Sequence, residues 1–151
     1  MITTQEILLR LTCATLVGLG LGLDRELRGI PAGLRTHALV ALSAAAITLS
    51  ALLLHDTLDA DGRTRTDPLR VIQGLAQAIG FIAAGVIFVA RDQVRNVTSA
   101  ANVWLTAAVG IAAGAGQWVL VGATSGLGLI VLVVVRLTER YLPRRPEADF
   151  E

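Results

Sequence analysis

The sequence predicts an all-α polytopic membrane protein with five transmembrane helices. Hydrophobic residues make up 54% of the 151 residues and charged residues only 17%, and the mean hydropathy of +0.65 exceeds what a water-soluble surface tolerates. A soluble helical bundle would need charged outer faces, whereas the apolar segments here are apolar around most of their circumference. Each segment has about the length that an α-helix needs to cross roughly 30 Å of hydrocarbon. The five segments are residues 7–23, 38–54, 71–90, 97–116 and 118–135.

Composition excludes several classes of function. The net charge is +1, so no basic surface is large enough to bind nucleic acid. Cys13 is the one cysteine, which rules out an intrachain disulfide and a cysteine-rich metal site. No Ser/His/Asp set, Cys/His pair or phosphate-binding glycine loop stands in a context that supports catalysis. We therefore expect no enzyme activity, no cofactor and no nucleic-acid partner.

The first helix is expected to begin at a capping box and to remain in the mature protein. Thr3 and Glu6 have the spacing at which a threonine hydroxyl and a glutamate satisfy the first amides of a helix. No basic leader or small-residue cleavage site precedes the apolar segment, so a removable signal peptide is not predicted. Arg10 lies near the start of this segment, and its long side chain is expected to reach the membrane interface.

Capping residues and a turn bound the later helices. Asp67 is expected to cap the third helix, which then begins at about Pro68, because proline at the first helical position loses no hydrogen bond. Thr98 or Ser99 is expected to cap the fourth helix. The uncharged turn Gly114–Gly116 joins the fourth and fifth helices in a tight hairpin.

The placement of arginines predicts the orientation. If five helices alternate, nine arginines lie on one side of the membrane and four on the other, so the positive-inside rule places the N-terminus outside and the C-terminus in the cytoplasm. We expect one transmembrane domain over residues 1–136 and a short cytoplasmic tail over residues 137–151. The nine are Arg25, Arg28, Arg35, Arg91, Arg95, Arg136, Arg140, Arg144 and Arg145, and the four are Arg10, Arg63, Arg65 and Arg70.

Small residues are expected to pack the helices together. Lipid gives helices no hydrophobic reason to associate, so tight contacts depend on small residues and a few buried polar groups. Glycines stand four residues apart at positions 18 and 22, 110 and 114, and 122 and 126. These ridges offer more contact surface than one small bundle needs, which predicts a homo-oligomer, namely a dimer. The glycines chosen for helix packing are Gly18, Gly22, Gly80, Gly85, Gly110 and Gly114.

Amide and hydroxyl side chains recur at helical spacing within the third and fourth helices. They either line a polar path or hydrogen-bond between packed helices, and none of them is ionisable, although ion paths usually include a carboxylate or histidine. Asp67 and Arg70 stand at the outer start of the third helix. Asp67 is a weak candidate magnesium ligand, although capping explains it without a metal. The stripe residues are Gln73, Gln77, Asn102 and Thr106.

Residues 24–37 form a dense charged segment between the first two helices. Pro31 and Gly33 force a turn, and Glu26 is expected to pair with arginine. Three interpretations stay open: an anchor on anionic lipid headgroups, a docking surface for a carboxylate or phosphate, or a gate. His37 is either a pH sensor or metal ligand or a simple helix-start residue. Glu26 would pair with Arg28 or Arg35, Thr36 would cap the second helix, and the candidate residues are Arg25, Glu26, Arg28, Arg35, Thr36 and His37.

Four motifs follow one another along the chain: Arg25-Glu26-x-Arg28 with Pro31-Ala-Gly-Leu-Arg-Thr-His37, Asp67-Pro-x-Arg70, Ile79-Gly-Phe81 with Gly85-Val-Ile87, and Val94-Arg95 leading through Thr98-x-Ala-Ala101 to Trp104-x-Thr-Ala107. In this order and at these separations they resemble the membrane domain of the MgtC/SapB family over roughly residues 15–118. The chain departs from the family pattern at Ala78 and Ala83, where glycine is usual, at Asn96, which replaces a glycine, and at Asn102, where a small or hydroxyl residue is usual.

The resemblance implies a bacterial inner-membrane protein linked to growth under magnesium limitation, without the soluble C-terminal domain of many family members. Some members resemble regulators of membrane complexes, including the proton-driven ATP synthase. We therefore expect a non-enzymatic regulator of magnesium homeostasis that acts in the lipid bilayer on a larger complex such as ATP synthase. The alternative is a small cation transporter or channel, with magnesium as its ion, in which Asp67 stands at the outer mouth of the path. That path would be lined by Gln73, Gln77, Asn102 and Thr106.

Overall fold

The computed structural model describes residues 2–60, 67–90 and 93–139 and confirms the predicted all-α membrane architecture. Four helices are long and apolar enough to cross a membrane, and a shorter apolar helix spans Trp118–Val134. That fifth helix continues through a π-helical segment to Glu139. The elements are α1 (Thr4–Glu26), α2 (Leu34–Ala60), α3 (Leu69–Val86), β1 (Phe88–Ala90), β2 (Gln93–Arg95), α4 (Val97–Gly114), α5 (Trp118–Ile130), η1 (Val131–Val135) and α6 (Arg136–Glu139).

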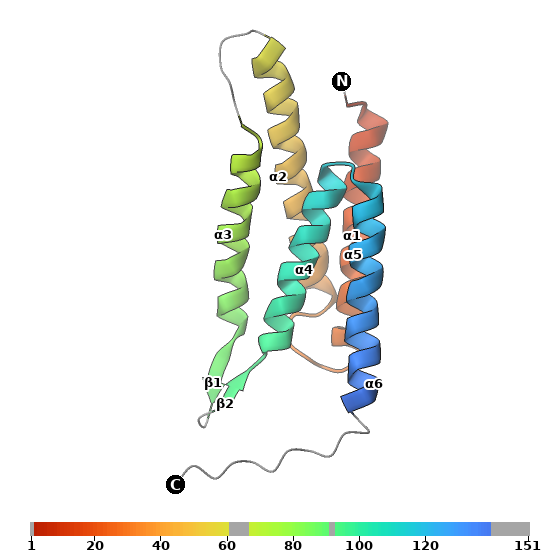
Figure 1. The fold of residues 1–151 in the computed structure, drawn as a ribbon, viewed down its shortest axis with the longest axis vertical. Helices are drawn as coiled ribbons and strands as arrows, with labels where there is room; N and C mark the ends of the chain where they lie inside the picture. The colour runs from red at the N-terminus through yellow and green to blue at the C-terminus, as the bar shows by residue number, and fades with distance from the viewer. Residues whose placement is uncertain (1, 61–66, 91–92, 140–151) are drawn as a thin grey trace.

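The helices run alternately up and down, with α1, α2 and α4 packed against one another at the centre (Figure 1). Helix α3 stands at one edge beside α2 and α4, and α5 packs on α4 at the other. One end of the bundle carries the loop of residues 27–33, the β1–β2 hairpin and α6. We call it the loop end, and the opposite end, where the chain begins and α4 turns into α5, the N-terminal end. The predicted alternation of the five segments therefore holds.

The third apolar segment is not helical to its end. Helix α3 stops at Val86, and Ile87 adopts an extended conformation. Residues 88–90 then pair in antiparallel fashion with residues 93–95, Phe88 opposite Arg95. The expectation of a helix through residue 90 is therefore wrong, because the run of β-branched and aromatic residues from Ile87 favours extended backbone.

Glycines bring the backbones of α1 and α4 into direct contact with α2. A methyl group at Gly110 would lie 2.5 Å from the carbonyl oxygen of Ala41, which belongs to the α2 backbone. Carbonyl oxygens cannot move away as flexible side chains can, so these positions exclude any larger residue. A methyl group at Gly114 would lie 2.5 Å from the Ala45 carbonyl oxygen, one at Gly18 2.7 Å from the His37 carbonyl oxygen, and one at Gly22 2.9 Å from the Cα atom of Leu34.

Other glycines do not pack as the sequence suggested. A methyl group at Gly80 would meet only the Trp104 ring at 3.4 Å, and one at Gly85 would meet nothing within 4 Å. The expected ridge of Gly122 and Gly126 also faces open space. Spacing alone cannot distinguish these positions from the packed ones, because it does not say which face of a helix turns inward.

Arg10 connects α1 to the C-terminus of α4 at the N-terminal end of the bundle. Its side chain is buried and donates from Nη1 to the carbonyl oxygen of Gly114, at 2.8 Å, while Nη2 pairs with Glu6. The guanidinium therefore satisfies a carbonyl at the C-terminus of α4, where cations are favoured. The sequence did not indicate this partner, because it lies 104 positions away in the chain.

Two of the predicted helix starts are confirmed. The Thr3 hydroxyl accepts from the Glu6 amide at 3.2 Å, as the capping box requires. The Asp67 carboxylate accepts from the Leu69 amide at 2.9 Å, where α3 begins.

The start of α4 differs from the prediction. The helix begins at Val97, before Thr98 and Ser99, and follows Asn96, whose φ of +66° lies in the left-handed region. The Asn96 side chain donates to the Val86 carbonyl oxygen at 3.3 Å. Glycine adopts a positive φ most easily, and asparagine tolerates it better than most other residues. This backbone conformation therefore explains why the family pattern has glycine here.

Substitutions at Asn96 test whether its backbone conformation or its side chain matters for stability. Asn96→Gly is expected to leave the free energy of unfolding within about 0.5 kcal/mol of the wild-type value, whereas Asn96→Val is expected to lower it by about 1–2 kcal/mol because a β-branched side chain is strained at positive φ. Unfolding by denaturant in detergent micelles measures both. Equal losses for the two variants would show that the side chain, and not the backbone, matters here.

Candidate functional site

Three polar side chains are buried together at the loop end, and we call them the polar cluster: Arg25, His37 and Asn102. They come from the last turn of α1, the first turn of α2 and the second turn of α4, respectively. Their exposed fractions are 6%, 0% and 3%. Three helices thus contribute one polar group each to a site that the apolar segments surround.

Hydrogen bonds fix the orientation of His37 and Asn102. The Nδ1 of His37 lies 2.9 Å from the carbonyl oxygen of Gly33, and because a carbonyl only accepts, Nδ1 carries the proton. Nε2 is then an acceptor for the Asn102 amide nitrogen, at 2.7 Å. The same nitrogen donates to the carbonyl oxygen of Leu21 at 3.3 Å. One amide group therefore links α4 to both α1 and α2.

The polar cluster has unused hydrogen-bonding capacity. Within the described residues, no partner reaches Nε and Nη2 of Arg25 or Oδ1 of Asn102, although these atoms are buried. Buried polar groups are normally paired, so each of these atoms offers a free donor or acceptor to a group from outside the chain.

The charged segment at the loop end is held by two interactions that differ from the predicted ones. The Glu26 carboxylate accepts from the Leu34 amide at 3.1 Å and so caps α2, while Arg28 pairs with Asp24 one turn earlier. The expected pairing of Glu26 with Arg28 or Arg35 is therefore not seen. Thr36 lies inside the first turn of α2 and is not its cap, because Glu26 arrives from the preceding helix.

Gly33 leaves room for the Glu26 carboxylate that caps α2. A Cβ atom on Gly33 would overlap the Glu26 carboxylate, so the turn and the cap depend on each other. Arg35 is exposed beside them. The segment therefore presents an exposed arginine on a loop whose shape is fixed.

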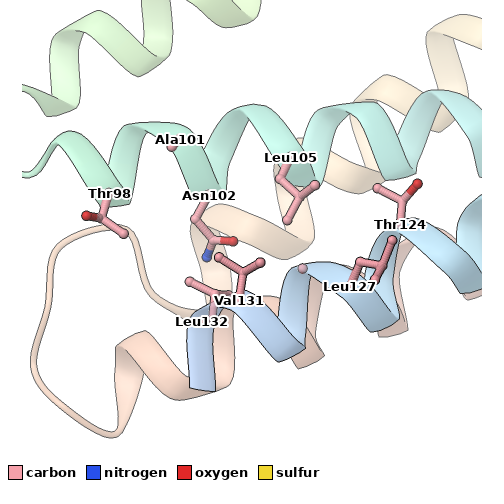
Figure 2. Close-up of a pocket in the computed structure, with 9 residues that line it drawn as sticks. Thr98, Ala101, Asn102, Leu105, Thr124, Leu127, Val131 and Leu132 are labelled. Carbon is pink, nitrogen blue, oxygen red and sulfur yellow. The ribbon is translucent and has the colours of Figure 1, made fainter. Parts of the chain in front are cut away.

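A cavity of about 440 Å³ adjoins the polar cluster between α4 and the lower part of α5. Figure 2 shows Asn102 projecting from α4 toward Val131 and Leu132 on the other wall. Its remaining lining is mostly apolar, with the hydroxyls of Thr98 and Thr124 at either end. The cavity therefore suits an apolar group that carries few polar atoms.

The predicted polar stripe does not assemble within one chain. Asn102 and Thr106 are buried in the bundle, and Thr106 donates to the Asn102 carbonyl oxygen at 2.8 Å. Gln73 and Gln77 are exposed on α3. Helix α3 turns its apolar residues toward α4 instead, and these are Leu75, Ile79 and Ala83.

Asp67 and Arg70, the outer candidates, are both exposed at the start of α3. Asp67 accepts from the Leu69 amide, so capping accounts for it. Across the described ranges, no three His, Cys, Asp or Glu side chains gather closely enough to hold a metal ion.

Sequence reasoning missed two contacts of the site. The pairing of Asp24 with Arg28 has the helical spacing of four residues that favours ion pairs, so the sequence contained a local signal for it. The bond between His37 and Asn102 joins residues 65 positions apart, and nothing local predicts it.

Comparisons with known proteins identify relatives of the whole transmembrane region. The profile of the MgtC family matches residues 11–141. The putative magnesium transporter YhiD of Escherichia coli K12 is 36% identical over 132 residues, which cover 87% of this chain and 61% of that protein. Protein SapB of Bacillus subtilis is 38% identical over 112 residues, or 74% of this chain and 48% of SapB.

Protein MgtC of Salmonella typhimurium LT2 is also 38% identical, over 111 residues that cover 74% of this chain and 44% of MgtC. The chain therefore spans about half to three fifths of the length of these relatives. No solved structure matches the chain.

Proposed function

Because the chain belongs to the MgtC family, we propose that it is a non-enzymatic membrane protein that serves magnesium homeostasis by regulating a larger membrane complex. The observation that carries this proposal is the closed contact among α1, α2 and α4. Glycines bring these three backbones together, so the middle of the bundle is filled by backbone and small side chains. Such an interior supports a rigid scaffold better than a path for an ion.

The chemistry of the interior supports the same proposal. Charged or amide groups are buried at the loop end and around Arg10 at the N-terminal end, whereas the layer between them is apolar except for two hydroxyls, which donate to carbonyl oxygens of their own helices: Thr48 and Thr106. A magnesium ion gives up its water reluctantly and requires oxygen ligands in octahedral geometry, and two separate hydroxyls do not provide such a set. The residues of this layer include Ala14, Ala41, Ala45, Val109 and Ala113.

The loop end is the surface that we assign to the regulated complex, and we place it on the cytoplasmic side from the arginine count. Leu27 is 78% exposed, and Pro31 and Arg35 are exposed beside it. The Glu26 bond to the Leu34 amide and the Asp24–Arg28 pair restrict this loop, which lowers the ordering cost that a partner has to meet on binding. An apolar side chain beside a guanidinium fits a partner surface that combines an apolar side chain with a carboxylate, and we propose a larger membrane complex such as ATP synthase as that partner.

The second candidate function is cation transport, and the name of the relative YhiD, a putative magnesium transporter, favours it. The route predicted from the sequence is not formed by one chain, because Gln73 and Gln77 face away from Asn102 and Thr106. Transport would therefore require another arrangement of the helices or more than one chain.

Two measurements distinguish the candidates. Purified protein in liposomes is expected to give no magnesium flux above that of empty liposomes, and the wild-type gene is expected to restore growth of a deletion strain at low magnesium. Arg35→Ala is expected to abolish co-purification of the membrane complex and that growth. The matched control Arg95→Ala removes an exposed arginine from the hairpin at the same end and is expected to keep both. Magnesium flux from the purified protein would establish transport instead.

A further inference from the structure

Helix α3 has a free side that faces away from the bundle. In Figure 1 it forms the edge of the molecule, with α2 and α4 as its neighbours on one side only. Its buried residues recur every four positions and meet α4. The opposite side of the helix is exposed along the whole length of a span long and apolar enough to cross a membrane.

This free side carries polar groups at membrane depth. Arg70, Gln73 and Gln77 are exposed and stand three and four residues apart, which places them on one face. Gln77 lies eight residues after Leu69, so a rise of 1.5 Å per residue puts it about 12 Å into the helix, close to the middle of the bilayer. Neither glutamine has a hydrogen-bond partner among the described residues.

Hydrocarbon cannot satisfy these amides. Each glutamine side chain has two donor hydrogens and an acceptor oxygen, and lipid tails provide no partner for any of them. Amide side chains in membrane helices are satisfied by hydrogen bonds to other helices. The exposed face of α5 differs, because its exposed residues, such as Val119 and Leu127, are suited to lipid. The free side of α3 is therefore a contact surface.

We propose that a second copy of this chain covers this face, α3 against α3, about a two-fold axis along the membrane normal. A two-fold contact brings the same residues of both chains together, and an amide group is complementary to itself because it both donates and accepts. Asp67 and Arg70 are exposed one turn apart at the N-terminal end, so the carboxylate of each chain meets the guanidinium of the other. Gly74 and Ala84 flank the glutamines and add little bulk, and Phe81, which is 83% exposed four residues after the second glutamine, adds an apolar ring to the same face.

The polar groups on the free side of α3 fit a second copy of this chain better than a different protein. A different membrane protein would need its own amides and both signs of charge at matching depths, whereas a second copy has them by symmetry. This contact gives the predicted dimer its interface and does not depend on whether the chain regulates or transports.

Cysteine cross-linking in native membranes tests the contact. Gly74→Cys and Ala84→Cys, each made with Cys13→Ala, keep both glutamines and place thiols on either side of them. Mild oxidation is expected to give a covalent dimer with at least one of these variants. The control Val119→Cys on α5, at a residue that is 88% exposed, is expected to remain monomeric. Equal cross-linking at Val119→Cys, or cross-links of the α3 variants to a different protein alone, would overturn the proposal.

A second experiment measures dimer affinity in a variant that lacks both glutamine amides. The double variant Gln73→Leu with Gln77→Leu is expected to raise the dissociation constant of the dimer in lipid nanodiscs at least tenfold by native mass measurement. Both side chains are exposed and make no hydrogen bond to the part of the chain that the structure describes, so the helical content of the variant should match the wild type. Gln117→Leu, an exposed glutamine at the α4–α5 turn, is the matched control and is expected to change nothing. A wild-type protein that is monomeric, or a double variant that dimerises as tightly, would refute the α3 contact.

Discussion

Gly110→Ala is expected to lower the free energy of unfolding by about 2–3 kcal/mol, because a methyl group forced into a packed interface strains the backbone around it. The new Cβ would lie 2.5 Å from the Ala41 carbonyl oxygen and 3.0 Å from its Cα atom. Both atoms belong to the α2 backbone, so relief requires α2 and α4 to separate. That separation would also loosen the neighbouring contact at Gly114.

The same substitution at Gly122 is the matched control. Nothing lies within 4 Å of a methyl group there, and alanine is a better helix former than glycine, so Gly122→Ala is expected to raise the stability by up to about 1 kcal/mol. Unfolding by increasing SDS fraction in mixed micelles, followed by circular dichroism, measures both. If the two variants shift the midpoint in the same direction, the close contact between α2 and α4 is not what stabilises the bundle.

His37→Leu and Asn102→Leu are each expected to cost about 1–3 kcal/mol, because each leaves a buried polar partner unpaired. The leucine at position 37 removes the acceptor at Nε2, and the leucine at position 102 removes the donor to both His37 and the Leu21 carbonyl oxygen. The double variant replaces both groups by apolar ones. Its loss is therefore expected to be smaller than the sum of the single losses by about 1 kcal/mol or more.

The double-mutant cycle is measured in the same micelles. Ser43→Ala serves as the control on α2, since the Ser43 hydroxyl donates only to carbonyls of its own helix, and a change within about 0.5 kcal/mol is expected. Strictly additive losses at positions 37 and 102 would mean that the two side chains do not interact in the membrane.

The helices could be predicted because each apolar segment has about the length that an α-helix needs to cross the hydrocarbon. Segment boundaries with local chemistry, such as Thr3 with Glu6 and Asp67 with Leu69, were also predictable from spacing. The start of α4 was not, because the positive φ of Asn96 leaves no trace in a hydrophobicity pattern. The extended residues after Val86 were missed because an apolar strand and an apolar helix end look alike in sequence.

The site was predictable residue by residue but not as an arrangement. Arg25 and His37 were candidates in the charged segment and Asn102 in the polar stripe, and only the fold brings Asn102 to the other two. Periodicity correctly placed Gln73 and Gln77 on one face of α3. It could not say that this face points outward, because that depends on which side of α3 the rest of the bundle occupies.

The bond between Arg10 and Gly114 has a consequence for biosynthesis. The acceptor is made 104 residues after the donor, so at about 5–20 residues per second the ribosome needs roughly 5–20 s to supply it. Glu6 is four residues away and is available to the guanidinium from the start, whereas the Gly114 carbonyl is not. The first segment therefore gains this tertiary bond only after the turn between α4 and α5 has been synthesised.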